Sequence, residues 1–187
     1  MKFSSFDIQG LLLLEPARRG DARGWFCETF RADLFATNAG VHGFVQDNES
    51  YSARSGTIRG LHFQIAPLAQ GKLVRCTAGA LFDVAVDLRS GSPTFGRWIA
   101  AELTMQNGKQ LWIPPGFAHG FCTLQPDTVI SYKVTRPYGP ECDKGLAWDD
   151  PAIGVKWPDC ADSETLSAKD RAQPALNNLP TYFTYKG

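Results

Sequence analysis

The chain has 187 residues, of which 43% are hydrophobic and 20% charged, so it can bury one substantial core but is short for two domains. Its 19 basic and 19 acidic side chains cancel, which leaves no overall field to attract nucleic acid or an anionic membrane. The first segment has an apolar run of only four leucines, too short for a signal peptide or a membrane span. We expect one domain over residues 1–187, with a C-terminal tail from about residue 158, in a cytoplasmic protein without nucleic-acid or membrane partners.

Short β-type runs recur from residue 10 to about residue 157, separated by Gly, Pro, Asn and Asp clusters at fairly even spacing. This pattern is typical of an all-β sandwich or barrel. Helical periodicity is scarce: one short helix is expected in RADLFATNAG, closed by Gly40, and another in SETLSAKDRAQP, after a cap at Ser163. In chain order, the predicted strands are LLLL, WFCETF, FVQDNESYS, TIRGLHFQ, KLVRCTAGALFDVAVDLR with a turn at Gly79, RWIAAELT, KQLWIPPG, HGFCTL and TVISYKVTRPY.

Alternation along the strands predicts which side chains share a face of the barrel. In ALFDVAVD, the carboxylate of Asp83 falls on the face opposite the large apolar residues of the same strand. In TIRGLHFQ, strict alternation puts Arg59 and His62 on opposite faces. A bulge at Gly60 would bring both into one pocket, and alternatively Arg59 could reach the pocket around the strand edge.

Two histidines lie in stretches that resemble the motifs of the cupin superfamily. GKQLWIPPGFAHGFCT matches the second motif, apart from Thr123, where Asn is usual. GTIRGLHFQ matches half of the first motif, but Gln64 stands where metal-binding members carry a second His, and residues 65–70 offer no carboxylate. His62 and His119 are fewer than the three or four protein ligands usual for zinc or non-haem iron, so we expect no metal.

Eight stretches, in order from about residue 10 to residue 170, resemble the dTDP-4-dehydrorhamnose 3,5-epimerase family. They are DARGWFCETF, QDNESYS, GTIRGLHFQ, QGKLVRC, FDVAVDLR, WIPPGFAHGF, YKVTRPYGPECDKGLAWDDPAIGVKWP and LSAKD. The resemblance implies a cupin-type jelly-roll barrel with a few short peripheral helices. It also implies a homodimer that converts dTDP-4-keto-6-deoxyglucose to dTDP-4-keto-rhamnose without a cofactor, by epimerisation at carbons 3 and 5.

The chemistry of such a substrate defines what the site must supply. The ketone at carbon 4 acidifies the protons on carbons 3 and 5, so the reaction needs a base, a group that stabilises the enolate oxygen, and an acid on the opposite face. By the resemblance, His62 is the base, paired with Asp170, and Tyr132 is the acid. Lys72 stabilises the oxyanion, and Asp83 orients Lys72 or His62.

The other matched positions are expected to hold the nucleotide and the sugar. Arg23 and Arg59 resemble diphosphate ligands, because a guanidinium group suits phosphate oxygens better than an ammonium group does. Tyr138 resembles the residue that stacks on thymine. The remaining expected substrate contacts are Glu28, Gln46, Asn48, Lys72, His119, Asp143 and Lys169.

Alternatives remain open within and beyond this fold. They are a mono-epimerase acting at one carbon, a 3,4-ketoisomerase of a related dTDP-sugar, a non-catalytic sugar-binding cupin, and a metal-dependent cupin dioxygenase. The four residues assigned to the chemistry favour the double epimerase, and the incomplete ligand set disfavours the dioxygenase. In the expected homodimer, the segment from Arg23 to Phe30 crosses to the partner, because WFCETF would otherwise present an open sheet edge.

Overall fold

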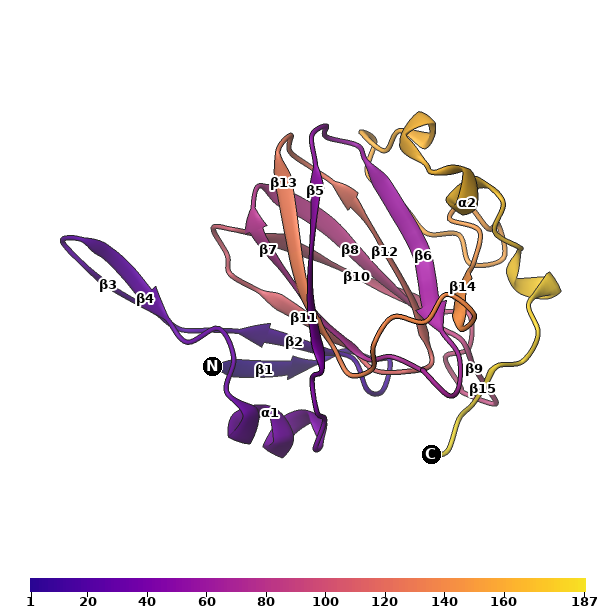
Figure 1. The fold of residues 1–187 in the computed structure, drawn as a ribbon, viewed down its shortest axis with the longest axis horizontal. Coiled ribbons are helices and arrows are strands. Elements are labelled where there is room, and N and C mark those ends of the chain that lie inside the picture. Colours follow the sequence, from indigo (N-terminus) through magenta and orange to yellow (C-terminus); the bar gives the residue numbers. More distant parts are fainter.

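In the computed structural model, which describes residues 1–187, two antiparallel sheets lie face to face (Figure 1). They form the predicted all-β, cupin-type jelly roll. The six-stranded sheet has the order β1-β2-β11-β7-β13-β5, and the five-stranded sheet has the order β10-β8-β12-β6-β14. The first comprises β1 (Lys2–Ser5), β2 (Leu12–Glu15), β5 (Gln46–Ser52), β7 (Lys72–Ala78), β11 (Gln110–Ile113) and β13 (Thr128–Val134). The second comprises β6 (Ile58–Gln64), β8 (Ala80–Asp87), β10 (Trp98–Thr104), β12 (Phe117–Thr123) and β14 (Asp143–Gly145).

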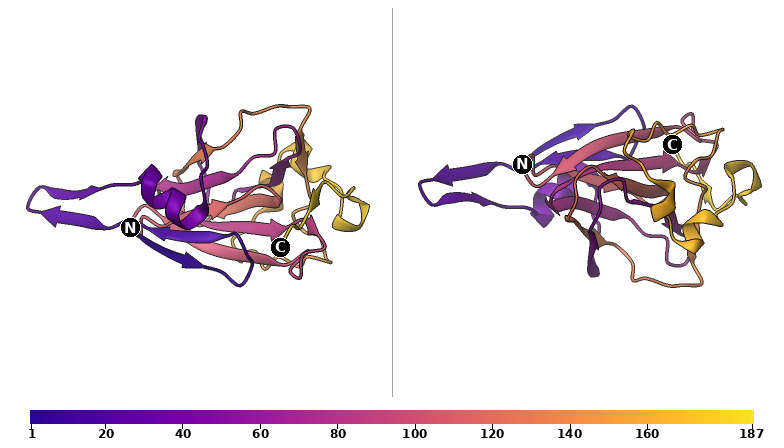
Figure 2. Two further views of the ribbon diagram at one scale, coloured as in Figure 1. Left: turned by 90° about the horizontal axis from the view of Figure 1, so that it is seen from below. Right: turned by 90° about the horizontal axis from the view of Figure 1, so that it is seen from above.

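Smaller elements surround the barrel. A hairpin of β3 (Arg18–Asp21) and β4 (Gly24–Cys27) projects away from it, as all three views show (Figures 1 and 2). No helix has the length and apolar character needed to cross a membrane. The other elements are α1 (Ala32–Ala39), the 3-10 helices η1 (Ser163–Thr165) and η2 (Leu176–Asn178), α2 (Ala168–Arg171), and the parallel pair β9 (Arg89–Ser90) and β15 (Phe183–Thr184).

The predicted helices had mixed outcomes. The first is confirmed as α1, which ends at Ala39 and is capped by Gly40, whose N–H bonds to the carbonyl of Ala36. The second prediction, one helix capped by Ser163, is wrong. Two short elements form instead, because the side chain of Asp162 caps η1 and that of Ser167 caps α2.

Both faces of the five-stranded sheet are buried. Between the sheets, Leu81 and Ala85 of β8 join the largest hydrophobic cluster. On the outer face, Val84 and Val86 pack under the C-terminal segment. Asp83 shares the parity of Leu81 and Ala85, so it points between the sheets on the predicted face, and it is 0% exposed.

Side chains do not alternate strictly along β6, because the strand has a bulge at Gly60, the first of the two predicted alternatives. His62 pairs with His119 of β12, but Arg59 pairs with Phe121, so the register shifts by one residue between them. The shift turns Arg59 and His62 to the same cavity. Gly60 has a φ of +119°, and a Cβ there would lie 2.8 Å from the carbonyl oxygen of His119, so the close approach of the strands requires glycine.

Candidate active site

A cavity of about 310 Å³ lies between the two sheets, beside α2. Its walls come from both sheets: β6 supplies Arg59 and His62, β12 supplies His119, and the facing sheet supplies Lys72 and Tyr132. Sequence reasoning did not single out four other lining residues, although the Ser-x-x-Asp spacing of LSAKD is a recognisable capping signal. These four are Ser50, Gly120, Phe121 and Ser167.

His62 and Asp170 form a hydrogen-bonded pair across 108 residues of sequence, with 2.5 Å between Nε2 and Oδ1. Asp170 is 5% exposed and His62 33% exposed. Burial alone would raise the pKa of the Asp170 carboxyl, but hydrogen bonds from His62, Ser167 and the N–H of Gly60 outweigh it and lower the pKa. Asp170 is therefore a carboxylate at neutral pH that fixes one ring nitrogen of His62, so the other ring nitrogen can exchange a proton.

A second histidine–carboxylate pair lies deeper in the same barrel. Nε2 of His119 is 2.8 Å from Oδ1 of Asp83, and their side chains are 9% and 0% exposed. Burial lowers the pKa of His119 by more than the charge and hydrogen bond of Asp83 raise it, so the ring is neutral at neutral pH. Oδ2 of Asp83 is buried and makes no hydrogen bond.

Lys72 begins β7 and brings a half-buried ammonium to the cavity. Burial lowers its pKa to about 8, while the charges of Asp143 and Asp83 act in the opposite direction. Its Nζ lies 3.4 Å from the carbonyl oxygen of His62. Lys72 is therefore charged at neutral pH and close to its titration range, which suits a group that stabilises a developing oxyanion.

Tyr132 faces the cavity from β13, in the sheet opposite His62. Burial raises the pKa of its phenol, so the hydroxyl keeps its proton at neutral pH and can donate it. Arg59 reaches from β6 toward β5, where its guanidinium donates to the carbonyl of Tyr51 at 3.0 Å and to the hydroxyl of Ser52 at 3.3 Å. The bulge thus places Arg59 beside the acid and base candidates.

An adjoining cavity of about 330 Å³ shares His62, Lys72 and Tyr132 with the first.

At the rim of this adjoining cavity, the hydroxyl of Tyr138 donates to Oδ2 of Asp143 at 3.1 Å, and Lys169 pairs with the same oxygen. The sequence-predicted residues of this rim are connected: the N–H of Tyr138 bonds to Gln46 at 3.2 Å, and Gln46 bonds to Asn48 at 2.7 Å. The ring of Tyr138 is 58% exposed.

Arg23 and Glu28 lie away from these cavities of their own chain. Arg23 is at the tip of the projecting hairpin, where it pairs with Asp21 and its side chain is 89% exposed. Glu28 follows β4 and lines a separate small cavity with Arg19 and Arg31.

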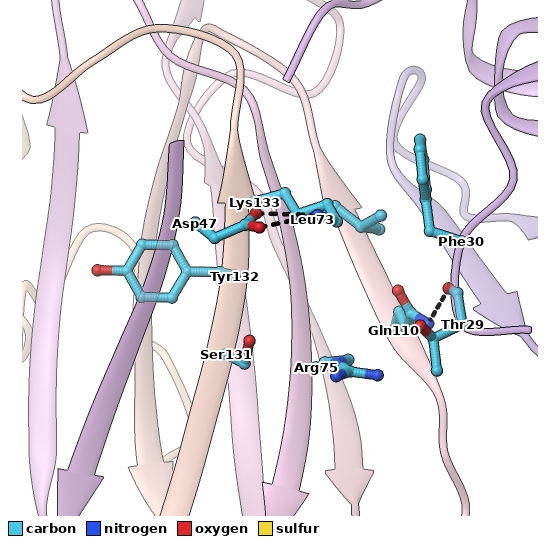
Figure 3. A pocket seen from close by; sticks show the side chains of 9 residues that line it. All are labelled: Thr29, Phe30, Asp47, Leu73, Arg75, Gln110, Ser131, Tyr132 and Lys133. Carbon is cyan, nitrogen blue, oxygen red and sulfur yellow. Dashed lines mark hydrogen bonds and ion pairs between the residues drawn. The ribbon is translucent and has the colours of Figure 1, made fainter. Parts of the chain in front are cut away.

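A fourth cavity, of about 180 Å³, lies against the outer face of the six-stranded sheet (Figure 3). The ring of Tyr132 points away from the rest of this lining, which matches its place in the barrel cavity. Lys133 and Asp47 are already joined as an ion pair at 2.9 Å. Because this outer cavity has no histidine and no free carboxylate, we place the candidate chemistry in the barrel. Its lining comprises Thr29, Phe30, Asp47, Leu73, Arg75, Gln110, Ser131, Tyr132 and Lys133.

The barrel does not offer the ligand set of a metal-binding cupin. No three His, Cys, Asp or Glu side chains of the chain lie close enough together to hold a metal ion. His62 and His119 each bond to a carboxylate of their own, and the amide of Gln64 bonds to backbone groups. The residues therefore do not fit a cupin metal centre.

The fold and the site define a cupin-type barrel enzyme built for acid–base chemistry. A carboxylate-bound imidazole and an un-ionised phenol face one cavity from opposite sheets, with the half-buried ammonium of Lys72 beside them. Proton removal on one side of a bound molecule and proton delivery on the other are the steps that such an arrangement supports.

Comparison with known proteins gives the family. Residues 5–178 match the family model of dTDP-4-dehydrorhamnose 3,5-epimerase. The dTDP-4-dehydrorhamnose 3,5-epimerase of Sinorhizobium fredii (strain NBRC 101917 / NGR234) is 60% identical over 185 residues, which cover 99% of this chain and 94% of the relative. The chain therefore belongs to the dTDP-4-dehydrorhamnose 3,5-epimerase family and is a carbohydrate epimerase of the isomerase class.

Two crystal structures are similar over nearly the whole chain. The dTDP-6-deoxy-D-glucose-3,5-epimerase of Legionella pneumophila Philadelphia 1, in complex with dTDP-4-keto-L-rhamnose, has a TM-score of 0.93 at 40% identity, with 100% of this chain and 99% of that chain covered. The dTDP-4-dehydrorhamnose 3,5-epimerase of Bacillus anthracis str. Ames, with TDP and PPi bound, has a TM-score of 0.89 at 47% identity, with 93% and 98% covered.

Proposed function

We propose that this chain epimerises dTDP-4-keto-6-deoxyglucose at carbons 3 and 5 and so forms dTDP-4-keto-rhamnose. The observation that carries the proposal is the placement of the His62–Asp170 pair and Tyr132 in one cavity, on opposite sheets, with Lys72 beside them. The ligand of the homologous Legionella enzyme, dTDP-4-keto-L-rhamnose, supports this choice of sugar nucleotide.

The proposed mechanism uses these side chains in sequence. His62 takes the proton from carbon 3 or carbon 5, and the electron pair of the C–H bond moves to form the enolate, whose charge resides on the oxygen at carbon 4. Lys72 stabilises that oxygen, and the carboxylate of Asp170 stabilises the imidazolium of His62. Tyr132 then donates its proton to the opposite face of the carbon. Exchange with solvent returns both groups to their starting protonation states.

The substrate contacts extend from the reacting sugar to the nucleobase. We assign the diphosphate to Arg59 and the thymine ring to Tyr138, at the rim that Asp143 and Lys169 share. His119, held by Asp83, lies in the sugar cavity. Gln46 and Asn48, which bond to each other beside Tyr138, contact the nucleotide.

Incubation with dTDP-4-keto-6-deoxyglucose in deuterated water tests the reaction, with NMR assigning the carbons that acquire deuterium. We expect deuterium at both carbon 3 and carbon 5 and conversion to the rhamno configuration. Exchange at a single carbon would indicate a mono-epimerase, and movement of the carbonyl group would indicate a 3,4-ketoisomerase. Binding without exchange would contradict the proposal and favour a non-catalytic cupin.

We further propose that the protein is a homodimer in which the β3–β4 hairpin brings Arg23 and Glu28 to the partner's cavity. The hairpin extends away from the barrel of its own chain (Figure 2). It carries two large apolar side chains at the surface, Trp25 at 52% and Phe26 at 67% exposure. Apolar groups on a projecting hairpin are favoured when a second subunit covers them.

Subunit complementation tests the exchange of hairpins. Arg23→Ala and His62→Ala are each purified, unfolded together and refolded as a mixture. If Arg23 acts in the partner's site, half the dimers are mixed and each has one intact site, so about a quarter of wild-type activity returns. An inactive mixture that nevertheless contains mixed dimers would place Arg23 in its own chain's site. Light scattering that finds a monomer would contradict the dimer itself.

We also infer a cytoplasmic location, because all five cysteines are free thiols, as is usual in a reducing compartment. Cell fractionation tests this, and recovery of the protein outside the cytoplasm would contradict it.

A further inference from the structure

Gln64 ends β6 with a side chain that is committed to two loops. Gln64 is 4% exposed. Its Oε1 accepts from the N–H of Gly139 at 2.8 Å, while Nε2 donates to the carbonyls of Leu68 at 2.9 Å and Pro137 at 3.0 Å. Both N–H bonds of the amide and its oxygen are thus used on backbone groups, which makes the site intolerant of any side chain without a donor and an acceptor.

The groups that Gln64 holds lie on either side of Tyr138. Gln64 bonds to the carbonyl of Pro137 and the N–H of Gly139, and Gln46 accepts the N–H of Tyr138 itself. Two glutamine side chains therefore fix the peptide groups on both sides of Tyr138. Because Tyr138 is 58% exposed, packing alone does not determine where its ring lies, so the position of its backbone matters.

The two loops meet tightly at this point. A Cβ on Gly139 would lie 2.3 Å from Cδ1 of Leu68, so the loops are already in contact beneath Tyr138. Gln64 also pairs in register with Asp143, the first residue of β14, whose carboxylate accepts from the hydroxyl of Tyr138. Gln64 thus holds the backbone on both sides of Tyr138, and Asp143, its partner in the sheet, holds the hydroxyl.

We propose that Gln64 is a positioning residue for the nucleotide end of the site: it sets Tyr138 for stacking on the thymine ring and takes no part in proton transfer. The inference rests on the proposed function, in which Tyr138 contacts the base. Gln64 stands where a metal-binding cupin would carry a histidine, so this strand position here serves nucleotide recognition through the loop that it holds.

Two substitutions separate the hydrogen bonds. Gln64→Glu keeps an acceptor for the N–H of Gly139 and loses both donors, whereas Gln64→Met keeps the length of the side chain and loses all three bonds. Asn107→Asp makes the same amide-to-acid change in the turn after β10, where Asn107 also bonds to backbone groups but lines none of the cavities described above, and serves as the control. Thermal melting verifies that each variant is folded.

The measurements distinguish loss of the contact between Tyr138 and the thymine ring from a general loss of binding or folding. For Gln64→Met we expect the Kd of dTDP and the KM of the dTDP-sugar to rise about tenfold, as for a weakened stacking contact, with kcat changed less than about twofold. Inhibition by inorganic pyrophosphate, which has no base, should stay at the wild-type level. Gln64→Glu would place a carboxylate against the carbonyls of Leu68 and Pro137, so it should weaken dTDP binding at least as much as Gln64→Met. Asn107→Asp should match the wild type.

A double-mutant cycle with Tyr138→Ala completes the test. If Gln64 acts through Tyr138, the effects of Gln64→Met and Tyr138→Ala on dTDP binding are not additive. Additive effects, or equal losses of dTDP and pyrophosphate affinity, would overturn the inference. If the wild type binds dTDP and Gln64→Met binds it equally well, the inference about Gln64 is wrong while the proposed function stands. If the wild type binds no dTDP, the proposed function is wrong as well.

Discussion

Replacing Lys72 by methionine should stabilise the fold at neutral pH and remove the activity. Burial lowers the pKa of Lys72 from its ordinary value near 10.5 to about 8, although Asp143 and Asp83 attract the charge. A depression of this size corresponds to about 3 kcal/mol of destabilisation by the charged form. Because the side chain borders a cavity that admits solvent, we expect about 1–3 kcal/mol. Methionine keeps the length of the chain without the charge.

The gain should depend on pH in one direction. Above about pH 10.5, lysine is neutral in the folded and unfolded chains, so its titration contributes nothing to the free energy of unfolding. As the pH falls toward about 8, the unfolded wild type binds the proton first, which favours unfolding. Below that pH both states are protonated and the full cost remains. The advantage of Lys72→Met should therefore be largest below about pH 8 and disappear near pH 10.5.

Urea unfolding of both proteins across this pH range measures the effect, because all other titrating groups are common to the pair. Lys156→Met, at an exposed lysine, is the matched control for the change from Lys to Met. A stability difference that stays constant from pH 7 to about pH 10.5, or a variant less stable than the wild type at pH 7, would refute the argument that Lys72 is held charged at a cost to the fold.

Three further substitutions test the remaining assignments. Tyr132→Phe should lower the yield of inverted product by about 10²–10⁴-fold and affect solvent exchange much less, and both are followed by NMR in one sample. Asp170→Asn should lower kcat about 10–100-fold in steady-state assays, because the imidazolium of His62 loses a charged hydrogen-bond partner. Arg59→Ala should raise KM at least about tenfold and leave kcat within about threefold, since a diphosphate contact is largely uniform binding.

The barrel could be predicted from the sequence because its strands carry their pattern locally. In β8 the alternation of Asp83 with its apolar neighbours places the carboxylate between the sheets, as the structure has it. Lys72 and Tyr132 fall on predicted strands for the same reason and meet in one cavity. Local alternation is sufficient wherever a strand pairs without interruption.

Contacts that depend on distant segments could not be predicted in this way. The glycine at position 60 made a bulge one of two alternatives, but only the close approach of β12 in the folded barrel decides for it. The short elements η1 and α2 each begin at a cap of their own, Asp162 and Ser167, and are too short to show an amphipathic pattern in the sequence. The pairing of His62 with Asp170 joins residues that only the folded chain brings together.

The separation of that pair has a consequence for the order in which the protein becomes an enzyme during synthesis. β13 is the strand of the six-stranded sheet nearest the C-terminus and ends at Val134, so every strand of that sheet is synthesised before the segment that carries Asp170. These strands already carry the base, the ammonium and the phenol, on β6, β7 and β13. The carboxylate that holds His62 arrives with α2, so catalytic competence requires synthesis through α2, whereas most of the barrel does not.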